Sequence, residues 1–128
     1  MTMDYTKLLP VSTFEEAHEI VKPLIERFQN SGLFQWVELT VTVNYYKVSA
    51  WTIRTVRIGR SEDTLTNSID LTVGTDRTGR PYIDLGGSDR LSGGDFIKGR
   101  RIKAEEVDAL IERYLAEIRN DRLKGERR

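Results

Sequence analysis

The chain has 128 residues, of which 38% are hydrophobic and 31% are charged, a balance typical of one globular domain with a modest core. It contains no cysteine, which excludes disulfides, thiolate metal sites and a cysteine nucleophile. Its 20 acidic and 20 basic residues cancel, whereas a dedicated duplex-DNA binder usually carries a basic surplus. No apolar run has the length of a membrane span, and residues 1–7 lack the features of a secretory signal. We therefore expect a cytoplasmic protein with no membrane partner.

Residues 12–32 carry the signals of one amphipathic helix. Ser12 and Glu15 form a capping-box pattern, in which the two side chains satisfy backbone amides at the helix start. The apolar residues at helical spacing form one stripe: Phe14, Ala17, Val21, Leu24, Ile25 and Phe28. Pro23 lacks a backbone donor, so we expect the helix to kink or restart there. Gly32 is expected to end the helix in the left-handed conformation.

Residues 34–43 alternate between apolar and polar side chains, which is the pattern of a strand with one buried face. The predicted buried set is Val37, Leu39, Val41 and Val43. The predicted water-facing set is Trp36, Glu38, Thr40 and Thr42. A parallel strand that is buried on both faces is apolar throughout, so the alternation favours an antiparallel sheet.

The next predicted strand, residues 47–58, alternates less cleanly. Trp51 and Ile53 share one parity, whereas Val56 and Ile58 share the other. One extra residue resets the phase of a strand. A β-bulge near residues 54–55 would therefore bring both pairs to the same face.

A hairpin is predicted over residues 69–85. Asp76 opens a type I turn and Gly79 occupies its left-handed position. This turn sets two apolar pairs opposite each other: Val73 with Ile83, and Leu71 with Leu85. The buried faces of the two strands then match, which makes the register self-consistent. Pro81 has no backbone donor for a neighbouring strand and predicts that the last strand lies at the edge of the sheet.

The C-terminal third begins with a glycine-rich stretch, residues 86–101, which is expected to form a long loop. A second helix follows, with a stripe of Val107, Leu110, Ile111, Tyr114, Leu115 and Ile118. Acidic residues near its start and basic residues near its end agree with the helix dipole. Residues 123–128 are expected to fray.

Together these elements predict a single α+β domain over residues 1–128, with residues 1–11 as a loose arm. The predicted order is α-β-β-β-β-α, with a four-stranded, mostly antiparallel sheet. Each helix has one apolar stripe and the sheet has one apolar face, so both helices are expected to pack on that face. The other face of the sheet is left open or is covered by a partner.

Few residues indicate chemistry. His18 has no nucleophile or second ligand at a telling spacing, so we interpret it as a structural helix residue. Asp70 and Asp84 are predicted to be diagonal cross-strand neighbours, which leaves a metal-dependent hydrolase or nuclease as an alternative function. The glycines of residues 86–101 match no nucleotide-binding motif. We therefore expect a non-enzymatic protein with no cofactor and no metal.

The strongest surface signal combines basic and aromatic residues, which are enriched at protein interfaces and also stack on unpaired bases. The predicted partner-binding residues are Trp36, Thr40, Arg54, Arg57, Asp70, Tyr82, Lys98, Arg100 and Arg101. This set predicts a protein-binding module that acts as a small inhibitor or adaptor of a larger partner. Small proteins of this kind are encoded by phages and mobile elements. Binding of single-stranded nucleic acid and a homodimer formed through the open sheet face are the alternatives.

Overall fold

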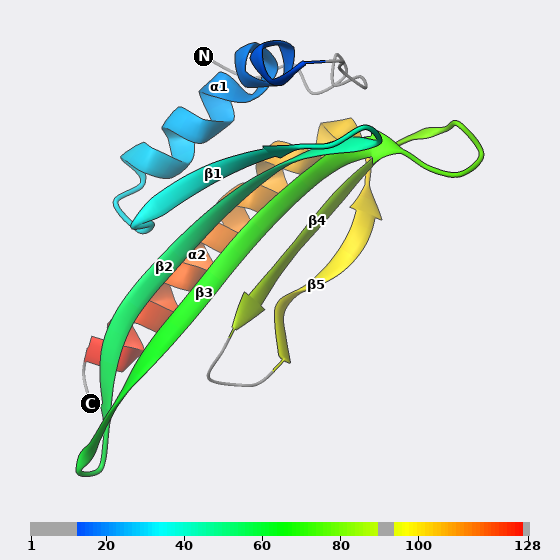
Figure 1. Ribbon diagram of the computed structural model, residues 1–128. Coiled ribbons are helices and arrows are strands. Elements are labelled where there is room, and N and C mark those ends of the chain that lie inside the picture. The colour runs from blue at the N-terminus through cyan, green and yellow to red at the C-terminus, as the bar shows by residue number, and fades with distance from the viewer. Residues whose placement is uncertain (1–12, 90–93, 127–128) are drawn as a thin grey trace.

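The computed structural model describes residues 13–89 and 94–126, with side chains throughout except at 53–58, 63–66, 88–89, 94–99 and 121–126. The predicted arm at residues 1–11 lies outside this range. Two helices and a five-stranded antiparallel sheet form an α+β fold (Figure 1). No helix within the described residues is both long enough and apolar enough to cross a membrane.

Helix α1 spans Phe14–Asn30. Its N-cap is Thr13, whose Oγ1 accepts a hydrogen bond from the Glu16 amide at 3.1 Å. The cap is thus one residue later than the predicted Ser12, which lies outside the described residues. The helix continues across Pro23 without interruption, so it does not restart there. Beyond its end Gly32 has φ +73°, the left-handed conformation that the sequence predicts.

The sheet contains β1 (Trp36–Val41), β2 (Tyr45–Ile58), β3 (Ser61–Thr75), β4 (Pro81–Asp89) and β5 (Gly94–Ile102), in that spatial order. The prediction of four strands and a loop over 86–101 is therefore wrong in one respect: most of that stretch belongs to β4 and β5. The β4–β5 pairing shifts register between Leu85 and Gly87 and again between Gly87 and Asp89. Such irregular pairing suits glycine-rich strands, which lack the alternation that identifies a strand in sequence.

The hairpin between β3 and β4 has the predicted register. Val73 pairs with Ile83, and Leu71 pairs with Leu85. The Asp76 amide donates to the Arg80 carbonyl at 2.9 Å, and Gly79 has φ +83°. The edge prediction from Pro81 is wrong, because β4 lies between β3 and β5. Pro81 is tolerated as the first residue of its strand, before the pairing with β5 begins.

The pairing of β2 with β3 is continuous from Tyr45 opposite Gly74 to Ile58 opposite Ser61. The predicted bulge at residues 54–55 is therefore absent from this ladder. Trp51 lies on the side of the sheet away from the core, where its ring stacks on that of Trp36. Val43, predicted to be buried, is 96% exposed in the turn between β1 and β2, where Thr42 Oγ1 accepts from the Tyr45 amide at 3.2 Å.

One core joins both helices to one face of the sheet. The sheet contributes the apolar side chains of alternate residues: Tyr46, Val48, Ala50, Ile69, Leu71, Val73, Leu85 and Ile102. Helix α2 (Val107–Glu126), which follows a short 3-10 turn at Ala104–Glu106, buries the predicted stripe, led by Val107, Ile111, Leu115 and Ile118. It ends at Glu126, within residues 123–128, for which fraying stays a prediction. Both helices therefore cover the same face, as predicted from the matched stripes.

Arg27 ties the two helices together. Its Nη1 donates to Asp108 Oδ1 at 2.8 Å, and its Nη2 lies 3.4 Å from the Asp108 carbonyl oxygen. The same guanidinium also pairs with Glu112, one helical turn further along α2. One side chain on α1 thus satisfies two carboxylates and a carbonyl near the start of α2, which fixes how the helices lie beside each other.

We predict that Arg27→Met destabilises the fold by about 1 kcal/mol, the usual contribution of a partly exposed ion pair that forms a small network. Arg113→Met is the matched control, because Arg113 pairs with Glu117 on the same helix and is well exposed. Urea denaturation at neutral pH measures both changes. Equal losses in the two variants would show that the link between the helices contributes nothing beyond surface charge.

Candidate functional site

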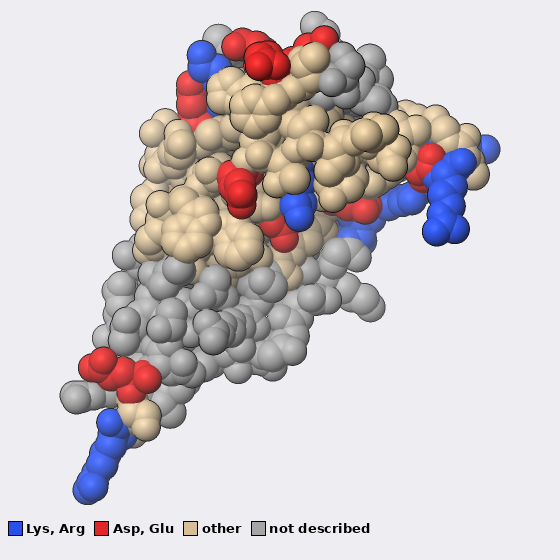
Figure 2. Space-filling model, in the orientation of Figure 1, with Lys and Arg blue, Asp and Glu red and all other residues tan. Residues whose placement is uncertain are grey.

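The sheet has a second face, which we call the open face, because no described element covers it. Strand alternation and the pairing of all five strands place one set of side chains there: Trp36, Glu38, Thr40, Tyr45, Lys47, Ser49, Trp51, Ser68, Asp70, Thr72, Tyr82, Asp84 and Arg101. In Figure 1 the strands lie in front of α2, so Figure 2 looks onto this side. On the described part of the open face, acidic and basic residues are interspersed with uncharged ones, and neither charge forms a broad patch (Figure 2).

Two tryptophans form an aromatic platform on the open face. Trp36 on β1 pairs directly with Trp51 on β2, and the rings stack with centroids 6.2 Å apart and an interplanar angle of 22°. Trp36 is 45% exposed, and Trp51 lies partly buried beside it. The Trp51 Nε1 is buried and has no hydrogen-bond partner among the described residues. The platform is therefore a large apolar surface with one unsatisfied donor beneath it.

Tyr82 is held in place at the opposite end of the open face. It pairs with Gly74 on β3, and its hydroxyl lies 3.0 Å from where a Cβ on Gly74 would stand. The Arg101 guanidinium lies over the Tyr82 ring, 4.9 Å from its centroid, as a cation–π contact. Glycine at position 74 thus lets the tyrosine approach the sheet closely, while the arginine covers the outer side of the ring.

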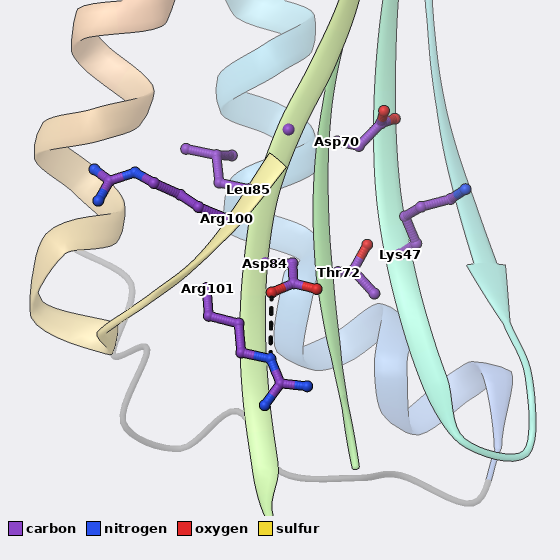
Figure 3. A pocket seen from close by; sticks show the side chains of 8 residues that line it. Lys47, Asp70, Thr72, Asp84, Leu85, Arg100 and Arg101 are labelled. Atoms are coloured by element: carbon purple, nitrogen blue, oxygen red, sulfur yellow. Dashed lines mark ion pairs between the residues drawn. The ribbon is translucent and has the colours of Figure 1, made fainter. Parts of the chain in front are cut away.

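Between the tryptophans and Tyr82 lies a shallow depression of about 570 Å³, which we call the Asp84 depression (Figure 3). It is lined by Lys47, Asp70, Thr72, Asp84, Leu85, Gly86, Arg100 and Arg101. Asp84 lies opposite Thr72 on one side and Arg101 on the other. Its Oδ1 is 4.0 Å from the Arg101 Nε, too far for a hydrogen bond, and is a buried acceptor without a partner among the described residues.

Asp76 holds both the β3–β4 turn and Arg101. Its Oδ1 accepts from the Thr78 hydroxyl at 2.6 Å and from the Thr78 and Arg80 amides at 2.9 and 3.0 Å. Its Oδ2 lies 3.3 Å from Arg101 Nη1. These donors, led by the Thr78 hydroxyl, lower the pKa of Asp76 from 3.8 to about 2. The carboxylate therefore stays charged and keeps Arg101 beside the depression.

The structure brings together five of the nine predicted partner-binding residues on the open face: Trp36, Thr40, Asp70, Tyr82 and Arg101. Arg100 pairs with buried Leu85 and its side chain extends toward α2 (Figure 3), although it also contributes to the lining of the Asp84 depression. The side chains of Arg54, Arg57 and Lys98 lie outside the described part. In the β2–β3 ladder, Arg54 pairs with Leu65 and Arg57 pairs with Glu62. The two arginine positions therefore differ in parity along the strand.

Two features of the site were not predicted. Trp51 was considered only in the strand pattern of residues 47–58, and its pairing with Trp36 was not foreseen. Asp76 was recognised only as a turn residue, because its contact with Arg101 joins residues 25 positions apart. The pairing of the strands was the missing signal in both cases.

The residues considered for catalysis, Asp70, Asp84 and His18, are not joined by further metal-binding groups among the described residues. Asp70 and Asp84 are diagonal neighbours across β3 and β4, as predicted, since Asp84 pairs with Thr72. The described residues contain no group of three or more histidine or acidic side chains that could hold a metal ion. His18 stacks on Phe14 at 6.1 Å on α1, away from the open face. The metal-dependent and nucleic-acid alternatives remain predictions.

We predict that Asp76→Asn lowers stability in a manner that depends on pH. The pKa of Asp76 is lower in the folded state, so its stabilisation is present above about pH 4 and is lost as the pH falls toward 2. The difference in urea midpoint between wild type and Asp76→Asn should therefore shrink across that window. Arg77→Ala is the matched control, since this exposed residue in the same turn makes no described contact with Asp76. A midpoint difference that stays constant from pH 5 to pH 2 would contradict the assigned contacts.

We predict that Gly74→Ala destabilises the fold by about 1–3 kcal/mol, the usual cost of overpacking. A Cβ at this position would lie 2.6 Å from the Asn44 carbonyl oxygen and 2.7 Å from the Tyr45 Cβ, neither of which can rotate away. Tyr82→Phe removes only the third contact, so the cost of Gly74→Ala should be nearly unchanged in that background. Thermal unfolding of wild type, both single variants and the double variant measures this cost. If the cost disappears in the Tyr82→Phe background, the strain lies at the tyrosine hydroxyl rather than at the backbone.

Comparison of the chain with models of known protein families, with curated proteins and with solved structures finds no match, so the functional proposal depends on the geometry of the open face.

Proposed function

We propose that this chain is a non-enzymatic protein-binding module, a small inhibitor or adaptor, that binds a larger partner through the open face of its sheet. The single observation that supports this most is the stacked pair of Trp36 and Trp51 on a sheet face that no described element covers. Large aromatic side chains at the centre of a mixed polar surface are typical of interface hot spots.

The exposed part of Trp36 is large enough to matter energetically. A fully buried aromatic side chain removes about 150–250 Å² from water, so a tryptophan that is 45% exposed leaves on the order of 100 Å² for a partner to bury. At about 25 cal/mol per Å², this corresponds to roughly 2–3 kcal/mol of hydrophobic transfer free energy, which favours binding before the costs of association are subtracted. Trp51 supports Trp36 from the neighbouring strand, so little side-chain freedom is lost on binding.

The charges around the platform favour a protein over a polyanion. Glu38, Asp70 and Asp84 lie on the open face together with Lys47 and Arg101, and Arg101 is already paired with Asp76. A nucleic-acid surface needs several uncompensated basic groups along one path. The open face instead offers donors and acceptors of both signs beside an aromatic pair, a mixture that is typical of a protein interface.

We predict that Trp36→Ala abolishes or weakens capture of the partner by at least tenfold, because the hot spot loses most of its apolar area. Immobilised wild type and variants are incubated with cell lysate, the retained proteins are identified, and the affinity of each is measured by calorimetry. Phe14→Ala is the matched control, because Phe14 is 51% exposed but lies on α1, away from the open face.

Sedimentation of the wild type is measured first. A monomer is expected, and a stable homodimer that dissociates on Trp36→Ala would reassign the open face to self-association. A partner retained equally by wild type and Trp36→Ala, and lost by Phe14→Ala, would move the binding surface to the helices.

A further inference from the structure

We propose that the protein partner adds an extended segment as a further strand to the edge of the five-stranded sheet, antiparallel to β1. This inference depends on the proposed function and describes how the partner reaches Trp36. It follows from the backbone groups that β1 points away from β2, from the lack of edge protection on β1 and from the place of Trp36 along that edge.

The phase of the β1–β2 ladder decides which backbone groups of β1 are already used. The two strands pair in one unbroken register, and the Thr42 amide just beyond β1 donates to the Tyr45 carbonyl at 2.7 Å. Hydrogen-bonded pairs alternate with non-hydrogen-bonded pairs along an antiparallel ladder. Counting back from Thr42 in steps of two gives the residues of β1 whose backbone bonds to β2: Thr40, Glu38 and Trp36.

The outer edge of β1 therefore carries the backbone groups of the residues in between. Their amides and carbonyls point away from β2, and they are Val37, Leu39 and Val41. β1 is the first strand of the sheet, and no described strand pairs on its outer side (Figure 1). The edge thus offers a row of alternating donors and acceptors, which are the groups that an extended backbone binds.

The two edges of the sheet differ in how they resist such pairing. Edge strands are commonly protected by charged residues, by proline or by irregular pairing. β5, the strand at the other edge, has four charged residues among nine, and its pairing with β4 shifts register twice. β1 has one charged residue among six, Glu38, has no proline and forms a regular ladder. β1 is therefore the edge that accepts a further strand.

The core side of β1 also has apolar surface left to bury. Val37 and Leu39 are only partly buried, whereas the residues paired with them on β2, Ala50 and Val48, are 0% and 1% exposed. The difference arises because β2 has a strand on each side and β1 has one neighbouring strand. Alternate side chains of an added strand would lie beside Val37 and Leu39 and complete their burial.

Trp36 lies at the position along this edge that favours a side-chain contact with the added strand. Its backbone is bonded to β2, so an antiparallel partner strand would meet it in a non-hydrogen-bonded pair. Side chains are closest in pairs of this kind, in which the Cα atoms are about 4.5 Å apart. Trp51 already stacks on one side of Trp36, and the opposing residue of the partner would cover the other side. One added strand therefore satisfies the free backbone groups and buries the exposed part of Trp36.

The test uses the isolated protein and a designed strand, so it does not require the natural partner. The probe is the peptide acetyl-Val-Thr-Val-Lys-Val-Tyr-amide. In the antiparallel orientation its valines lie opposite the outward residues of β1, its lysine opposite Glu38 and its tyrosine opposite Trp36. The peptide is titrated into ¹⁵N-labelled protein, and amide shifts and hydrogen exchange are followed by NMR. Saturable binding is expected, with protection from exchange gained at Val37 and Leu39 and unchanged at Glu38.

Two N-methylated versions of the probe separate backbone pairing from side-chain contact. A methyl group on the amide of the central valine removes the donor that faces Leu39, whereas a methyl group on the lysine amide removes a donor that faces away from β1. The two peptides have the same composition and differ only in where the methyl group lies. The first should bind at least tenfold more weakly than the probe, and the second should bind as well as the probe. Equal affinities of the two peptides would overturn strand addition.

Two variants of the protein locate the contact on β1. Val37→Pro removes one outward donor, and an edge strand accepts a proline where the missing donor faces outward, so the fold should persist. Val37→Ala is the matched control, because it removes apolar area at the same position but keeps the donor. Val37→Pro should weaken binding of the probe at least tenfold relative to Val37→Ala, and equal affinities would contradict pairing with the edge backbone. The NMR spectrum shows whether Val37→Pro is folded, and if it is not, the two methylated peptides decide.

The same variants separate this inference from the proposed function. Capture of a partner that requires Trp36 but is unchanged in Val37→Pro would overturn strand addition and leave the protein-binding function in place. A dimer in which the amides of Val37 and Leu39 are protected from exchange without any probe would assign the edge to a second copy of this chain. That result would overturn the partner strand.

Discussion

The unbroken pairing of β2 with β3 is the constraint on which the rest of the structure depends. Side chains alternate along a strand, so this one ladder decides which residues face the helices and which face outward. Tyr46, Val48 and Ala50 enter the core, whereas Lys47, Ser49 and Trp51 remain on the other side. A slip of one residue would bury a lysine and expose a tyrosine, so the apolar core and the open face enforce the same register.

The helices complete this arrangement without contributing to the site. Both pack against one face, and Arg27 fixes α1 beside α2 through Asp108 and Glu112. The other face is thereby left with side chains that are spaced by the sheet itself. A row of directly paired residues crosses all five strands and ends at Asp84 and Arg101: Thr40, Lys47, Thr72, Asp84 and Arg101.

Sequence reasoning succeeded where alternation and turn chemistry agreed and failed where they conflicted. The β3–β4 register follows from Asp76, Gly79 and the apolar residues on either side, which all indicate one pairing. The pattern around Trp51 was misread because its apolar neighbours of both parities suggested a bulge, although Trp51 forms half of a stacked pair in an unbroken ladder. β5 was missed because glycines obscure its alternation. The contact of Asp76 with Arg101 depends on that missed strand.

The part of the open face around Asp84 is built from strands rather than from loops, and this has a consequence for how a partner would bind there. Its described walls are held by backbone pairing on both sides, so no segment has to open or close around an incoming group. A partner that uses the open face would therefore meet a preformed surface. Differences in affinity among variants of that interface would then appear mainly in the rate at which the complex dissociates.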